Sequence, residues 1–197
     1  IDSSGNVGIG VTPEAWQSSY DVLQISSGAS IAGSTTNKSR LFLNANTYIN
    51  TSNQQSYIAT DEASQYWQNG GTHIFNVAPS GTADAAISWN TAMTINNAGI
   101  VTKPYQPAFL LEKNADQSFP ATTHTTVSWQ VEVYDINSDC SSGVFTAPVD
   151  GRYFLYTQIR FNSLDNNASY QDLKIQTSNR DFRELIDLGG LGGDPDY

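Results

Sequence analysis

Residues 152–161 restrict the fold more than any other stretch of this chain. All but one of their odd positions are apolar, and a β-strand turns every second side chain to the same face. These odd positions are Tyr153, Leu155, Thr157, Ile159 and Phe161. The even positions include Phe154 and Tyr156, which a strand with one wet face would not carry. We therefore predict a long strand whose odd face lies in a core and whose even face, with Phe154 and Tyr156, meets another sheet or another subunit.

The residues before this strand predict a tight turn. Pro148 fixes one φ angle and Gly151 supplies conformational freedom at the other end of the segment 147–151. Residues 143–145 precede the turn and read as a short strand. The expected local structure is strand, turn and strand.

The same region resembles the central signature of the C1q-like domains. The resemblance rests on Phe145, on Gly151 after five intervening residues and on Tyr153, with Trp129 and Asp135 upstream. It covers residues 104–161. It implies a trimeric jelly roll of the C1q and tumour-necrosis-factor type, and names no ligand.

Two positions depart from that signature, and the length departs as well. Cys140 stands where an aromatic residue is expected, and Leu155 replaces a phenylalanine. A jelly roll of about eight strands needs on the order of 120 residues, whereas residues 104–197 supply 94. Either the domain continues elsewhere or it differs from the family. We expect the glycine-rich tail, residues 184–197, to be flexible.

Composition indicates an all-β chain with a true core. Hydrophobic residues make up 39% and charged residues only 14%, and the remaining surface is rich in Ser, Thr, Asn, Gln and Gly. We expect a helical turn at 14–19, an exposed loop at 26–39 and a boundary at the two prolines of 102–107. The strands predicted by short alternating runs are 21–25, 41–49, 56–60, 72–77, 85–89, 92–95, 108–111, 125–134, 143–145, 152–161 and 173–177.

The charge excludes two classes of partner. The net charge is −10 and the isoelectric point about 4.3. Nucleic acids and anionic membrane surfaces require clustered Lys and Arg, which no window supplies. No apolar run approaches the ~20 residues of a membrane span. No signal peptide is visible, and because the first residue is Ile1 we expect the natural chain to begin upstream.

A short repeat frames the first half of the chain. Residues 1–7, IDSSGNV, and 95–101, INNAGIV, share the spacing of Ile, Asp or Asn, Gly and Val. We predict that both form the same strand–turn–strand unit, as in a modular array. Residues 1–13 also resemble a phrase common in phage tail-fibre and other virion fibre proteins, which implies a fibre module.

No arrangement of reactive residues predicts catalysis. Cys140, His124 and His73 are the residues from which a nucleophile–base pair could be built, and no motif joins them. Asp61 and Glu62 are the one adjacent acid pair, and we interpret them as a solvated turn rather than as a glycosidase pair. We predict no enzymatic activity and no catalytic residue.

A metal site and a sugar platform stay open as alternatives. Residues 135–139, DINSD, copy the start of a calcium loop, but Cys140 replaces its glycine and Thr146 its final glutamate, which excludes an EF-hand. We interpret the run as a turn, with no cofactor and with calcium as the alternative. Four aromatic residues could stack on sugars, although core packing is the more common use of such side chains. They are Trp16, Tyr66, Trp67 and Trp129.

Together these features predict an all-β chain with a fibre-shaft module over residues 1–103, a trimeric C1q-like jelly-roll head over 104–183 and a flexible tail over 184–197. The expected function is structural and adhesive, in an extracellular virion fibre or spike of a phage tail. The expected partners are further copies of the chain, other virion proteins and a host-surface glycan or protein bound by head loops such as 162–171. The alternatives are a secreted or surface C1q-like binding protein of a cellular organism, and a fibre-borne glycan depolymerase.

Overall fold

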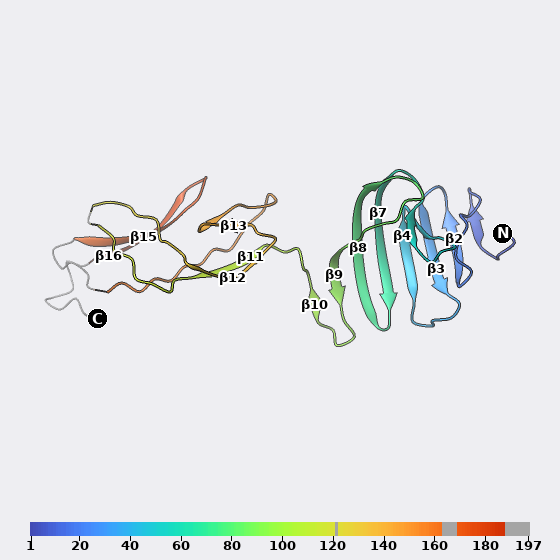
Figure 1. The fold of residues 1–197 in the computed structure, drawn as a ribbon, viewed down its shortest axis with the longest axis horizontal. Coiled ribbons are helices and arrows are strands. Elements are labelled where there is room, and N and C mark those ends of the chain that lie inside the picture. The colour runs from blue at the N-terminus through green and yellow to red at the C-terminus, as the bar shows by residue number, and fades with distance from the viewer. Residues whose placement is uncertain (121, 163–168, 188–197) are drawn as a thin grey trace. The chain divides into compact units, whose positions relative to one another are not determined.

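The computed structural model describes residues 1–120, 122–162 and 169–187. Within these ranges the chain is all-β, with sixteen strands and no helix, so the predicted fold class is confirmed at this level. The chain divides into two compact units, Ile1–Pro107 and Ala108–Tyr197 (Figure 1). The boundary lies directly after residues 102–107, the proline-containing segment in which the sequence predicted it.

A large sheet forms the first unit, whose residues are all described. Its strands lie in the order β1-β2-β3-β4-β7-β8-β9-β10 (Figure 1). Every neighbouring pair is antiparallel except β1 with β2. The strands are β1 Val7–Ile9, β2 Tyr20–Ile25, β3 Ala29–Ser34, β4 Leu41–Ala45, β7 Asp61–Asn69, β8 Thr72–Gly81, β9 Asn90–Ile95 and β10 Val101–Thr102.

A second, smaller layer covers one face of the large sheet. It consists of β5 (Thr47–Ile49) paired with β6 (Gln55–Tyr57), extended on either side by the bridges Trp16–Asn50 and Ser56–Ala86. The main core lies between the layers, and Phe42 at its centre is 2% exposed. Its buried members are Trp16, Tyr20, Val22, Ala32, Phe42, Tyr48 and Ile49.

Glycine sets the sharpest turn of the large sheet. β7 and β8 are joined by Gly70 and Gly71, with φ angles of 59° and 79°. Two consecutive residues with positive φ form the hairpin turn whose twist matches the flanking strands, and glycine adopts this conformation without cost. This turn therefore joins two of the longest strands of the unit.

One turn design occurs three times, at residues 2–6, 50–54 and 96–100. In each copy the first side chain, that of Asp2, Asn50 or Asn96, accepts hydrogen bonds from the backbone N–H groups two and four residues later, at 2.9 to 3.1 Å. The fourth residue has positive φ: 89° at Gly5, 61° at Asn53 and 81° at Gly99. The predicted likeness of 1–7 and 95–101 is confirmed for the turn, but only 95–101 has a strand on both sides, since residues 1–6 contain no strand. The copy at Asn50 was missed because Asn53 replaces the glycine.

A buried row of polar side chains crosses the large sheet on the face that the small layer covers; we call it the polar row. Its members are in register on β3, β4, β7, β8 and β9: Ser30, Asn44, Gln65, Asn76 and Thr91. Each hydrogen-bonds to the next, and the donor–acceptor distances lie between 2.9 and 3.3 Å. Because a buried amide is costly unless it is paired, this continuous chain is what allows polar residues at the centre of the sheet.

The second unit has a different construction. Its described strands pair only as three separate two-stranded ladders. They are β11 (Ala108–Glu112) with β12 (Val131–Ile136), β13 (Cys140–Ser141) with β14 (Val144–Phe145), and β15 (Tyr170–Gln176) with β16 (Asp181–Asp187). Neither a jelly roll nor a larger sheet is formed by the described residues of this unit.

Several sequence-based expectations need correction. Residues 26–39 contain β3 rather than forming one loop, and residues 14–19 form no helical turn but supply the Trp16 bridge. β7 was not predicted, since Gln, Ser and Asn occupy much of it. The strand expected at 125–134 begins only at Val131. Residues 184–187 lie in β16, and the rest of the expected flexible tail, 188–197, lies outside the described residues.

Candidate functional site

The segment 152–161 has the predicted alternation without the predicted ladder. Its odd side chains are half-buried and its even side chains exposed, residue by residue, yet no strand pairs with it among the described residues. Tyr153 packs edge-on against Phe145 at 5.2 Å between ring centroids. Phe154 is 91% exposed and Tyr156 is 73% exposed. The odd face therefore packs within the second unit, and the even face of this chain is bare.

The second unit lacks a core of its own in the part that the structure describes. Cys140, at 6% exposed, is the one residue between 108 and 187 that is buried as a whole within the described ranges. Large apolar side chains are instead exposed on all three ladders and on the turn: Leu110, Val133, Tyr134, Val144, Val149, Tyr170, Phe182, Leu185 and Ile186. Hydrophobic burial is the dominant stabilising force in folding, and the described part of this unit achieves little of it.

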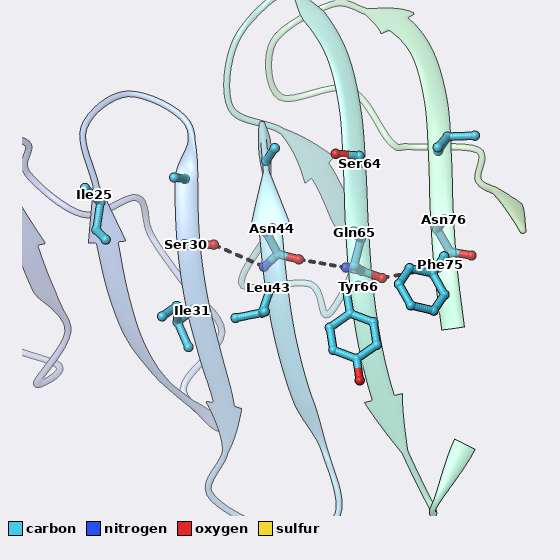
Figure 2. A pocket seen from close by; sticks show the side chains of 13 residues that line it. Ile25, Ser30, Ile31, Leu43, Asn44, Ser64, Gln65, Tyr66, Phe75 and Asn76 are labelled. Carbon is cyan, nitrogen blue, oxygen red and sulfur yellow. Dashed lines mark hydrogen bonds between the residues drawn. The ribbon is translucent and has the colours of Figure 1, made fainter. Parts of the chain in front are cut away.

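The large sheet of the first unit also has an uncovered apolar face, opposite the small layer. One cross-strand line on this face, which we call the outer row, consists of Leu23, Ile31, Leu43, Tyr66, Phe75 and Met93. Figure 2 shows the side chains of Ile31, Leu43, Tyr66 and Phe75 side by side on adjacent strands. Ile31 and Leu43 are each 42% exposed. The covered side thus holds both the main core and the polar row, and the open side holds an apolar line where a sheet that faces water would carry polar residues.

A second line of small and apolar residues runs beside the outer row. It consists of Ile25, Ala29, Ala45, Ser64, Val77 and Asn90. At the sheet edge Val7 continues the outer row and Ile9 continues the second line. Both lines lack charged residues, and together they line a shallow groove on the sheet. We call the two lines together, with Val7 and Ile9, the outer face.

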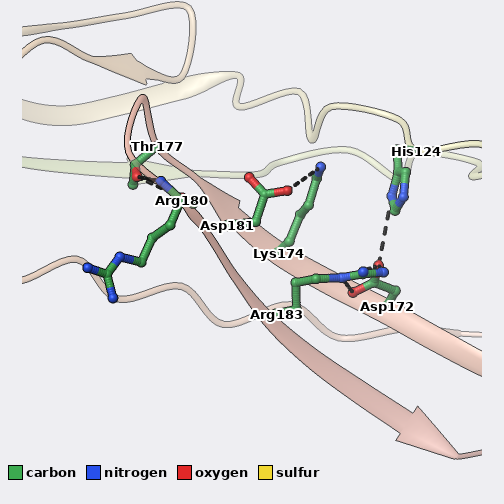
Figure 3. Close-up of polar contacts among 7 residues, drawn as sticks. All are labelled: His124, Asp172, Lys174, Thr177, Arg180, Asp181 and Arg183. Carbon is green, nitrogen blue, oxygen red and sulfur yellow. Dashed lines mark hydrogen bonds and ion pairs between the residues drawn. The ribbon is translucent and has the colours of Figure 1, made fainter.

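A compact charge cluster lies on the last ladder of the second unit (Figure 3). Arg183 of β16 binds Asp172 of β15 through two nitrogens, one of them Nε at 3.1 Å, and His124 Nδ1 lies 3.9 Å from the same carboxylate. The hydrogen bond from Arg183 is the main cause that lowers the pKa of Asp172. Lys174 and Asp181 form a neighbouring pair at 3.2 Å. These pairs cross-link β15 and β16.

The calcium-like run folds as a turn. Asp135 accepts hydrogen bonds from the backbone N–H groups of Asp139 at 3.1 Å and Cys140 at 2.9 Å. Asn137 and Ser138 adopt positive φ. Both carboxylate oxygens of Asp135 are thus engaged by backbone donors, which supports the turn interpretation. Nowhere in the described ranges do three His, Cys, Asp or Glu side chains gather as they would around a metal ion.

The residues considered as a nucleophile, as a base or as an acid pair each have other local contacts. Burial, followed by the charges of Asp135 and Glu132, raises the pKa of the Cys140 thiol, which opposes formation of the reactive thiolate. His73 stacks on Tyr66, and its Nδ1 hydrogen-bonds to the Tyr66 hydroxyl. Hydrogen bonds from Glu62 lower the pKa of Asp61. Asp61 and Glu62 are exposed, as expected, but they begin β7 rather than forming a turn.

Three of the candidate sugar-stacking aromatics are used for packing. Trp16 lies in the main core, and Trp67 stacks on Phe42 at 5.5 Å. The Trp129 ring lies against Gly143, where an added Cβ would come within 2.7 Å of it. Tyr66 belongs to the outer face. The loop 162–171 that was predicted to contact a host falls largely on residues 163–168, which lie outside the described residues.

We compared the chain with known protein families, with curated proteins and with solved structures, and none of them matches it. The described residues contain no helix with the length and apolarity that a membrane crossing needs.

Proposed function

We propose that this chain is a structural and adhesive segment of a homotrimeric virion fibre or spike, with a shaft module in its first unit and a C1q-like head in its second. The observation that carries the proposal is the second unit, which exposes Phe154 and Tyr156 on a bare strand-like segment and buries no hydrophobic residue but Cys140 in its described part. In the proposed trimer the even face of residues 152–161 packs against other copies. The same segment then pairs as a strand of the jelly roll that its sequence resembles.

The energetic argument concerns Phe154. An aromatic side chain buries ~150–250 Å², which at ~25 cal/mol per Å² is worth about 4–6 kcal/mol. Left in water, that contribution is lost, and it is comparable with the whole stability of a small domain. Three copies that share this face about one axis recover it. The uncharged polar surface and the virion-fibre resemblance of residues 1–13 support placing the trimer in a fibre, with a host-surface glycan or protein as the ligand.

Sedimentation of the full chain at micromolar concentration tests the proposal. The unmodified chain should sediment as a trimer, and Phe154→Ser should dissociate or aggregate it. Gln158→Ala, which alters the same exposed face at a polar position, should leave the trimer intact. A well-folded monomer of the unmodified chain would contradict the proposal.

Hydrogen exchange tests the jelly-roll part separately. The backbone amides of residues 152–161 should be protected in the trimer, because they pair as a strand there. Rapid exchange of these amides in an intact trimer would exclude the C1q-like head while leaving the oligomer in place.

A further inference from the structure

We propose that the outer face of the large sheet is a second interface between copies of this chain, distinct from the even face of residues 152–161. This inference rests on the proposed function, because it assumes that the second units bring the copies together. The occupant that we assign to this face is the same face of the other copies.

The first argument is the inverted polarity of the sheet. On the covered side Asn44 and Gln65 are buried and hydrogen-bonded to each other at 3.0 Å. On the open side their sequence neighbours Leu43 and Tyr66 lie in the outer row (Figure 2). A sheet that kept its open side in water would gain by the reverse arrangement. Both sides of this sheet are therefore built for burial.

The second argument is size. Seven strands spaced ~4.8 Å apart make each line of the outer face about 30 Å long, and the two lines with their margins cover on the order of 600 Å². Apolar patches on ordinary monomers reach ~300–600 Å², and each partner in a standard interface contributes ~800 Å². The outer face is at the limit for a monomer and approaches what a stable contact needs.

The third argument is charge, and it selects the occupant. Two copies that each carry −10 repel one another, so they can pack closely only through a surface without carboxylates. The two lines of the outer face have none. A charged partner would find no group of opposite sign on this face, and the polar side chains that a glycan would meet there are those of Ser64, Tyr66 and Asn90, of which Tyr66 and Asn90 already hydrogen-bond within the chain. Copies joined through their second units also meet at a high effective concentration.

Thiol labelling of the full chain tests this interface. Leu43→Cys places a thiol in the middle of the outer row, and Ser52→Cys places one on an exposed turn of the small layer as the matched control. Peptide mass spectrometry distinguishes both from the native Cys140. In the assembled protein the thiol at position 43 should react at least about tenfold more slowly with a maleimide than the thiol at position 52. Circular dichroism checks that both variants keep their sheet.

Sedimentation of the same samples separates the two proposals. An assembled chain with slow labelling at position 43 supports the second interface. An assembled chain with equal labelling at both positions overturns this inference and leaves the proposed trimer standing. A monomeric chain overturns both, whichever rate is found, because slow labelling would then mean that the face is covered within one chain.

Discussion

Asp2, Asn50 and Asn96 have one role at three places in the chain. Each side chain folds back over its own turn and holds two backbone N–H groups. The fourth residue must then adopt a left-handed conformation, which glycine tolerates best and asparagine next. The pattern that defines this turn is therefore Ile, then Asp or Asn, with Gly or Asn three residues later. A search for invariant glycine finds two of the three copies.

The cost of positive φ can be measured at Gly99 without interference from packing. Gly99→Ala should destabilise the first unit by about 1 kcal/mol, because φ is 81° and no atom lies within 4 Å of the added methyl group. Gly33→Ala is the matched control, since Gly33 also has open space around it but no positive φ. Urea denaturation followed by tryptophan fluorescence gives both values. Equal effects of the two substitutions would show that strain is not the cause.

The ladder of β15 and β16 depends on the ion pair between Asp172 and Arg183. Arg183 lowers the pKa of Asp172, so the stabilisation is present above the ordinary aspartate value of about 3.9 and is lost as the pH falls through the lowered value in the folded chain. Arg183→Leu should bring the pKa of Asp172 back up toward its ordinary value. Lys174→Ala should raise it less, because Lys174 is the smallest contributor. A carbon-13 NMR titration of the Asp172 carboxyl group measures both, and an equal change in the two variants would contradict this assignment.

Sequence periodicity predicted the all-β class and the two-faced segment 152–161, because these depend on local residue order. It missed β7 because Gln65 and its neighbours are polar, although the polar row makes their burial favourable. It also gave no sign of the outer face, since cross-strand lines such as the outer row join residues far apart in the chain. Residues 152–161 keep the predicted alternation without a paired strand among the described residues, because alternation sets the face of each side chain and not the strand beside it.

The chain combines a net charge of −10 with two proposed interfaces that carry no carboxylate, although the even face of residues 152–161 also carries Arg152 and Arg160. Mutual repulsion opposes association, whereas burial of uncharged apolar surface is insensitive to screening. Raising the ionic strength from 0.01 M to 1 M shortens the screening length from ~30 Å to ~3 Å. Association of the copies should therefore strengthen with sodium chloride, as measured by sedimentation equilibrium. Weaker association at high salt would indicate that ion pairs between copies dominate, contrary to the interfaces proposed above.

The polar row has a direction, and two tryptophans define it. An indole N–H can only donate, so the Trp89 ring next to Gln55 requires the amide oxygen of Gln55 to face it. The same oxygen accepts a hydrogen bond from the Gln65 amide nitrogen at 3.4 Å. This hydrogen bond orients the Gln65 amide and, through it, the amides of Asn44 and Asn76. Beside the far end of the row, Trp16 fixes Gln24 in the same way at 3.2 Å. The side-chain dipoles of the row consequently add rather than cancel. Trp89 decides the direction in which their sum points, although Trp89 lies in none of the strands that carry the polar row.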